Sequence, residues 1–301
     1  MSSLGCTIHL ILLNLQQNFD MKRVSISILL TLSLVLASCG SYTKVQKTTD
    51  YLYKYEAAKE YYASGLYNRA ALLLQDVIMS LKGTERGEES LYLIAMANYK
   101  AKNFSAAQTY FKKYYQTYPK GLYAEEAYFY SGRSLYMDIP PIKLDQTVTY
   151  EAINEFQSFL ELYPQSKYSA DVQDIIYKLQ DRLVEKEYLS AKLYYDLGTY
   201  FGNCASGGSN FQACIITAEN AVRDYPFTSR REDFAILILR AKFDLAKQSI
   251  DSKKEERYHN AIDEYYGFTN EFPESVYMKE AQEMFSKAEK YVKSTSGSKE
   301  N

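Results

Sequence analysis

Apolar residues recur three and four positions apart along most of the chain, from about residue 51 to residue 293, with polar and charged residues between them. A helix has about 3.6 residues per turn, so this spacing gathers the apolar side chains on one helical face. Turn-forming residues such as Gly65, Asn103 and Pro140-Pro141 interrupt the pattern. The pattern therefore predicts an all-α fold made of consecutive helices.

One arrangement of residues returns in five of the predicted helices. In each of them an aromatic residue is followed by a small residue. The residues four and seven positions after the small one are expected to pack in the seam between two helices, and in four segments a proline stands twelve positions after it. The small residues are Ala70, Ala107, Ala152, Cys214 and Ala261, and the prolines are Pro119, Pro164, Pro226 and Pro273, with Lys82 in place of the first proline. A small residue lets two helices approach closely, and proline stops a helix. These segments are therefore predicted to be the second helices of tetratricopeptide-type helical hairpins.

The helices that precede the early repeats keep a register of their own. Three sets of residues are spaced by 37 positions, namely Ala58, Ala95 and Gly132; Tyr55, Tyr92 and Phe129; and Tyr62, Tyr99 and Tyr136. A fixed period of this length indicates stacked repeats. We therefore predict one α-solenoid of about five tetratricopeptide-like hairpins over residues 51–293, followed by a disordered tail at residues 294–301.

The first 38 residues have the layout of a secretory signal. Met21 opens a basic Met-Lys-Arg start, residues 24–35 form a short apolar run, and Leu36-Ala37-Ser38-Cys39 ends it with small residues. The apolar run is too short to span a bilayer comfortably. Because residues 1–20 would bury this signal behind a non-basic leader, Met21 is interpreted as the true start, and residues 1–38 as upstream leader and signal peptide.

The end of this signal resembles a bacterial lipobox, in which the cysteine is acylated and becomes the first residue of the mature protein. Acyl chains on Cys39 would hold the protein on a membrane without a transmembrane helix. The polar residues 39–50 are then expected to be a lipid tether. They lack an acidic run after the cysteine, which favours the periplasmic face of an outer membrane. The alternative is a plain cleaved signal whose Cys39 falls at the cut site by coincidence.

Composition and charge argue against several other classes of protein. With 47% hydrophobic and 24% charged residues, the chain can bury ordinary cores. Its net charge is −2, and loss of residues 1–38 removes a net +1 and leaves −3, so no basic excess is present to bind nucleic acid. Of the two histidines, only His259 stays in the processed chain, which is too few for most catalytic triads or for a histidine-rich metal cluster. We therefore expect no enzyme activity, no metal and no cofactor.

Cys204 and Cys214 are the other cysteines of the processed chain, ten residues apart around a Gly/Cys-rich insertion at residues 201–210. In an oxidising compartment the two thiols can form a disulfide that closes this loop. Cys214 also occupies a small seam position, where a free buried cysteine packs well. The sequence leaves both readings open.

A series of short motifs follows the lipobox and the early repeats in a fixed order. They are Asp138-Ile139-Pro140-Pro141, Asp145-Gln146, Tyr163-Pro164-Gln165-Ser166-Lys167-Tyr168, Asp181-Arg182-Leu183, Glu187-Tyr188, Ala191, Tyr194-Tyr195, and Arg223-Asp224-Tyr225-Pro226 with Thr228. Together they resemble the BamD family, the lipoprotein subunit of the outer-membrane β-barrel assembly machinery. The resemblance covers almost the whole mature chain. The insertion at residues 201–210 and an extra loop at residues 249–255 depart from the family pattern.

The resemblance implies a non-catalytic, lipid-anchored scaffold that faces the periplasm. Its partners would be the barrel assembly protein, which carries periplasmic domains, and unfolded outer-membrane proteins. Because the family docks onto its barrel partner through its C-terminal half, the two departures put the partner geometry in doubt. The alternative function is that of another periplasmic tetratricopeptide lipoprotein, such as a pilotin or a cell-envelope division factor.

The first helices of the early hairpins supply a candidate peptide-binding groove. Residues seven apart return to nearly the same helical face. The sequence therefore predicts two aromatic rows across three repeats, formed by Tyr55, Tyr92 and Phe129 and by Tyr62, Tyr99 and Tyr136. Arg133 would supply a cation for the carboxylate of an unfolded barrel-protein segment. The alternative is that one of the rows is buried between helices.

Overall fold

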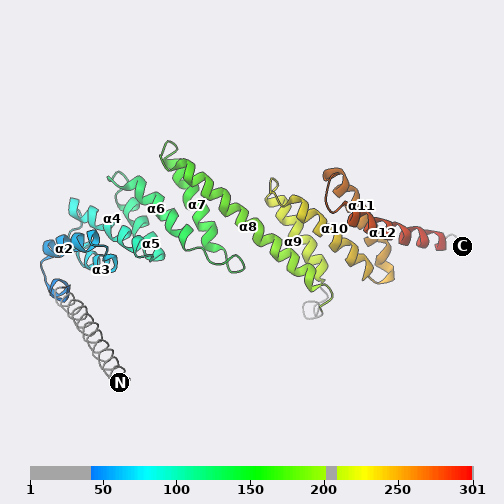
Figure 1. Cartoon of the computed structure of the whole chain (residues 1–301), viewed down its shortest axis with the longest axis horizontal. Helices are drawn as coiled ribbons and strands as arrows, with labels where there is room; N and C mark the ends of the chain where they lie inside the picture. Colours follow the sequence, from blue (N-terminus) through cyan, green and yellow to red (C-terminus); the bar gives the residue numbers. More distant parts are fainter. Residues whose placement is uncertain (1–41, 201–208, 300–301) are drawn as a thin grey trace, which may run out of the picture. The chain divides into compact units, whose positions relative to one another are not determined.

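The computed structural model describes residues 42–200 and 209–299 (Figure 1). Within these residues it contains eleven α-helices, α2 to α12, preceded by a helical segment at residues 42–47, and no strand. The predicted all-α fold is therefore confirmed, and its helices pack in sequential pairs, consistent with a tetratricopeptide-like repeat array. The chain divides into two compact units that meet between Ser134 and Leu135, and each unit is described by itself.

The first unit holds two complete helical hairpins and most of a fifth helix. Its helices are α2 (Tyr51–Ala63), α3 (Tyr67–Val77), α4 (Glu85–Lys100), α5 (Phe104–Thr117) and α6 (Ala124–Met137), whose last residues belong to the second unit. Helices α2 and α3 pack together, as do α4 and α5, and α3 packs on α4. One continuous apolar core therefore runs through the unit from Val45 to Ala127.

Local signals at the helix ends explain where these helices begin and turn. The Asp50 carboxylate accepts hydrogen bonds from the backbone N–H groups of Leu52 and Tyr53, both at 3.0 Å, and so caps α2. The Thr84 hydroxyl caps α4 by accepting from the Gly87 N–H at 3.1 Å. Between α2 and α3, Gly65 adopts a φ of +76°, a left-handed conformation that glycine tolerates without strain. The chain can therefore reverse direction within a few residues.

The second unit continues the same alternation of helices. Its helices are α7 (Thr147–Leu162), α8 (Ser169–Leu197), α9 (Asn210–Asp224), α10 (Arg231–Lys247), α11 (Asp251–Glu271) and α12 (Met278–Lys299). Each of these helices packs on the next one along the chain, and α10 also contacts α8 and α12. Helix α8 is the longest of the six, with 29 residues.

The five small residues of the repeat pattern lie where the sequence predicts, in the seams between helices. Ala70, Ala107, Ala152 and Cys214 are completely buried, and Ala261 is 2% exposed. The aromatic residues that follow them, such as Phe111 and Phe156, are also completely buried. Close helix approach and ring packing therefore come from the same short pattern, because the small residue and the residue four positions later share one helical face.

Three segments differ from the sequence-based expectation. Within the predicted tether, residues 42–47 are helical, and Val45 is only 6% exposed. The Tyr42 ring packs edge-on against Tyr61 at 5.6 Å, and the Arg69 guanidinium lies over it at 5.2 Å. This segment therefore joins the fold, because its aromatic and apolar residues lie three positions apart and share one helical face.

The other two differences lie near the C-terminus. Helix α12 continues through the predicted tail as far as Lys299. The extra segment at residues 249–255 is largely helical, because α11 begins at Asp251. The leader, the signal peptide and Cys39 lie outside the described residues.

The connection between α6 and α7 explains why two of the family-like motifs occur together. Gln146 is buried, with 4% exposure, and its side-chain amide donates hydrogen bonds to the Pro141 and Leu144 carbonyls at 3.0 and 3.1 Å. Arg182 of α8 donates to the Gln146 side-chain oxygen at 3.1 Å and to the Pro140 carbonyl. Side chains therefore bind the backbone of this connection, in which the Leu144 N–H also donates to the Pro141 carbonyl at 2.9 Å.

Candidate peptide-binding site

The structure separates the two predicted aromatic rows. Tyr55, Tyr92 and Phe129 are 2%, 8% and 3% exposed, so this row lies in the core and is not available to a peptide. The prediction that it lines a groove is therefore wrong, and the alternative of one buried row describes it. Each of these residues stands three positions before a small residue of the same register, where the neighbouring helices approach most closely.

The second row keeps an accessible edge in the first unit. Tyr62, near the end of α2, and Tyr99, near the end of α4, are both half-buried. The Tyr62 ring contacts Tyr67 edge-on at 5.4 Å. Tyr136 is also half-buried, but it belongs to the second unit.

Tyr99 is the centre of an aromatic cluster that α4, α5 and α6 build together. Its ring lies edge-on to Tyr130 at 5.0 Å and to Phe104 at 5.6 Å. The Arg133 Nε donates a hydrogen bond to the Tyr99 hydroxyl at 3.2 Å, and its guanidinium lies over the Phe129 ring at 5.8 Å. Arg133 is therefore positioned by aromatic neighbours on two helices while remaining half-buried.

Burial and a nearby carboxylate keep the tyrosines of this region protonated. Desolvation raises the pKa of Tyr62 and of Tyr92, and Glu126 raises both further through its negative charge. Tyr92 also donates a hydrogen bond to Glu126. The neutral hydroxyls can therefore act as hydrogen-bond donors, while Arg133 and Glu126 supply one positive and one negative group on α6.

We call Tyr62, Tyr99, Tyr130 and Arg133 the aromatic strip. Sequence reasoning found three of its members and missed Tyr130, which follows the buried Phe129 directly and does not belong to the 37-residue register. Tyr130 stands three residues before Arg133 and therefore shares its helical face. This spacing is the sequence signal by which Tyr130 could have been found.

The remaining predicted site residues are the cysteines. Cys214 is completely buried in the α9 seam, and burial raises its thiol pKa to about 12. Such a thiol is a weak nucleophile at neutral pH. Cys39 and Cys204 lie outside the described residues, so lipidation and the Cys204–Cys214 disulfide stay predictions.

Two further observations apply to residues 42–200 and 209–299. There, no group of three or more His, Cys, Asp or Glu side chains is placed to hold a metal ion. None of the helices in these ranges is long and apolar enough to cross a membrane.

The paired helices and the buried small-residue seams define an array of tetratricopeptide-like helical repeats. A family model described as "YfiO: Outer membrane lipoprotein" matches residues 47–206 of this chain. The chain therefore belongs to the YfiO family, the BamD family of outer membrane lipoproteins, which confirms the resemblance found in the sequence.

Two further comparisons add little to this assignment. No curated protein matches the chain. Among solved structures, the chain is similar to one titled "Assembly Chaperone of RpL4 (Acl4) (Residues 1-338)", at 15% identity over 84% of this chain and 99% of that one, with a TM-score of 0.28. A likeness at this level carries no functional argument.

Proposed function

We propose that the protein is a non-catalytic scaffold of the outer-membrane β-barrel assembly machinery. It is anchored through acylated Cys39 to the outer membrane and faces the periplasm. It binds the barrel assembly protein, which carries periplasmic domains, and it binds segments of unfolded outer-membrane proteins through the aromatic strip. The observation that carries this proposal is the membership of residues 47–206 in an outer membrane lipoprotein family.

The chemistry of the aromatic strip supports the peptide-binding part of the proposal. Half-buried tyrosine rings offer apolar faces at little cost in conformational entropy, because each has few rotatable bonds and its neighbours already hold it in place. Arg133 adds a fixed cation that can pair with a carboxylate in bidentate geometry. An extended segment that ends in an aromatic residue with a free carboxylate matches both features.

Fluorescence anisotropy with a labelled peptide that ends in phenylalanine tests this binding. We expect Tyr62→Ala, Tyr99→Ala and Arg133→Ala to weaken binding, whereas Tyr53→Ala, at a tyrosine of α2 that is 51% exposed, leaves it unchanged. Arg133→Ala should also abolish any preference for a free over an amidated C-terminus. Circular dichroism confirms that each variant is folded. Equal affinities for the wild type and all folded strip variants would place peptide binding elsewhere.

Affinity purification from solubilised outer membranes tests the scaffold part. We expect a barrel protein with repeated periplasmic domains to co-purify with the tagged chain. Recovery of a secretin or of division proteins in its place would favour the alternative function, a pilotin or a cell-envelope division factor.

A further inference from the structure

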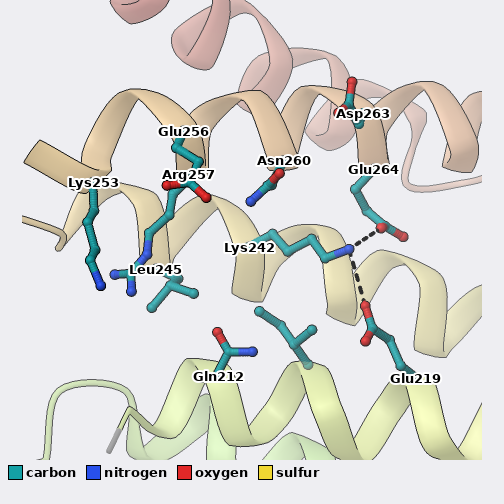
Figure 2. A pocket seen from close by; sticks show the side chains of 11 residues that line it. Gln212, Glu219, Lys242, Leu245, Lys253, Glu256, Arg257, Asn260, Asp263 and Glu264 are labelled. Atoms are coloured by element: carbon teal, nitrogen blue, oxygen red, sulfur yellow. Dashed lines mark hydrogen bonds and ion pairs between the residues drawn. The ribbon is translucent and has the colours of Figure 1, made fainter. Parts of the chain in front are cut away.

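A cavity of about 530 Å³ lies in the second unit among α9, α10 and α11 (Figure 2). Its volume is within the range of pockets that hold ligands. The residues that line it begin at Gln212, whereas the match to the family model ends at residue 206. The family assignment therefore gives this cavity no role. The cavity is also separate from the aromatic strip, which belongs to the first unit.

An ion-paired lysine lines one end of the cavity. Lys242 of α10 lies 2.7 Å from the Glu264 carboxylate of α11 and 3.2 Å from the Glu219 carboxylate of α9 (Figure 2). Burial lowers the pKa of Lys242, but the two carboxylates outweigh this effect and raise it overall. This lysine is therefore charged and compensated within the protein, so it has little remaining capacity to hold an external anion.

The opposite end carries two cations, Lys253 and Arg257, and one exposed carboxylate, Glu256, so its net charge is positive. Lys253 and Arg257 stand four positions apart on α11, so they share one helical face, and both line the cavity. Arg257 donates a hydrogen bond to the Ser249 hydroxyl at 2.5 Å. Within the part of the chain that the structure describes, neither side chain lies within ion-pair distance of a carboxylate.

Lys253 of this basic end lies in the segment at residues 249–255 that departs from the family pattern, and Arg257 follows that segment closely. Helix α5 begins at Phe104, three residues before its small seam residue Ala107, whereas α11 begins at Asp251, ten residues before Ala261. The seven additional residues form about two extra turns of helix. Lys253 and Arg257 lie on these turns, so the insertion extends the wall of the cavity and supplies its positive charge.

Between the two ends, the cavity offers groups suited to a polypeptide backbone. Gln212 of α9 and Asn260 of α11 carry side-chain amides that can both donate and accept hydrogen bonds (Figure 2). Ile215 and Leu245 provide apolar surface beside them. An extended peptide presents the same combination of alternating amide groups and short side chains.

We infer that this cavity binds an extended acidic peptide segment, whose carboxylate side chain pairs with Lys253 and Arg257 and whose backbone contacts Gln212 and Asn260. Charge complementarity sets the direction of the segment, because an acidic side chain at the other end would meet Glu219 and Glu264. The protein would thus have a second peptide site, which requires a different chemistry from the aromatic strip.

Fluorescence anisotropy with three labelled hexapeptides tests the inference on the full-length protein. Their sequences are Ala-Ser-Glu-Ser-Asn-Ala and its counterparts with Gln or Lys in place of Glu, all carrying the fluorophore on the N-terminal amine and amidated at the C-terminus. We expect the Glu peptide to bind about tenfold more tightly than the Gln peptide, as two partly exposed ion pairs allow. The preference should weaken as salt is added.

Charge reversal makes the test specific. In the double variant Lys253→Glu, Arg257→Glu, the Lys peptide should bind more tightly than the Glu peptide. The matched control, Lys287→Glu with Lys290→Glu on exposed positions of α12, changes the net charge equally and should leave the preference intact. Equal binding of the three peptides to the wild type, an absence of saturable binding, or an equal effect of the control variant would overturn the inference.

Discussion

Gln146 is the best position at which to measure how side chains hold the irregular connection between α6 and α7. Its amide group donates to the Pro141 and Leu144 carbonyls. Its oxygen accepts from the Thr149 hydroxyl at 2.8 Å and from Arg182 Nε at 3.1 Å. Replacement by alanine removes these four hydrogen bonds at once, together with a longer one to the Ile142 carbonyl at 3.4 Å, and leaves the Arg182 guanidinium with one partner fewer.

The expected loss follows from these four bonds. A protein hydrogen bond contributes about 0.5–1.5 kcal/mol net. Because Pro141 and Leu144 are exposed, their carbonyls can turn to water, so we expect Gln146→Ala to cost about 2–4 kcal/mol rather than the full penalty of buried orphan groups. Gln146→Glu keeps both acceptor contacts and loses the two donations, so it should cost about 1–2 kcal/mol. Gln165→Ala, at an exposed turn position, is the control and should cost less than about 0.5 kcal/mol.

Two measurements together decide the outcome. Urea unfolding followed by circular dichroism gives the stability, and amide hydrogen exchange reports on residues 142–146 directly, since a repeat array need not unfold in a single step. We expect exchange of these amides to accelerate in Gln146→Ala and to remain unchanged in Gln165→Ala. If Gln146→Ala has wild-type stability and wild-type protection of this connection, the four hydrogen bonds do not hold it.

Three further predictions concern packing, lipidation and pH. Ala107→Trp overpacks a completely buried seam position and should cost about 1–3 kcal/mol or more in urea unfolding, whereas Gln116→Trp on the exposed face of α5 should not; equal midpoints would argue against the seam. Mass spectrometry of the native protein should find an acylated N-terminal Cys39, and Cys39→Ser should leave a folded protein that no longer partitions into membranes; an unacylated wild type would refute this. Arg240 holds the pKa of Glu280 below its ordinary value of 4.5, so this pair stabilises the fold above that pH and the contribution is lost as pH falls through the lowered pKa. Glu280→Gln should therefore cost less than about 1 kcal/mol at neutral pH and nothing in strong acid, and a penalty that grows on acidification would contradict the assignment.

The repeat architecture was predictable because one short pattern controls three structural features. A small residue such as Ala107 sets how closely two helices approach, Phe111 four positions later fills the space beside it, and Pro119 ends the element. These requirements are local and recur in every hairpin, so a single sequence displays them several times. The segments before and after the repeats carry no such pattern. In the segment before the repeats, the helix is held by contacts such as Tyr42 on Tyr61, which join residues far apart in sequence.

The candidate site was harder to predict for a related reason. Tyr55 and Tyr62 occupy nearly the same face of one helix, yet Tyr55 is buried against α4 while Tyr62 keeps an accessible edge. Periodicity identifies the face, but the position of a residue along the helix axis decides whether a neighbour covers it. Tyr130 was missed because it lies outside the 37-residue register, and its contact with Tyr99 joins two helices, α6 and α4, that are separate in sequence.

The additional turns at the start of α11 show how a repeat array can gain a charged surface while its seam positions are kept. The seam residue Ala261 and the aromatic Tyr258 keep the places that the pattern assigns to them, and both are buried. The added residues continue the same helix towards its N-terminus, so they need no new loop. Because they extend beyond the seam, polar side chains are accepted there: Lys253 and Arg257 line the cavity, and Lys254 lies over the Tyr291 ring at 5.5 Å. A helical extension of this kind therefore changes charge and shape at one edge while the packing that stabilises the hairpin stays as it was.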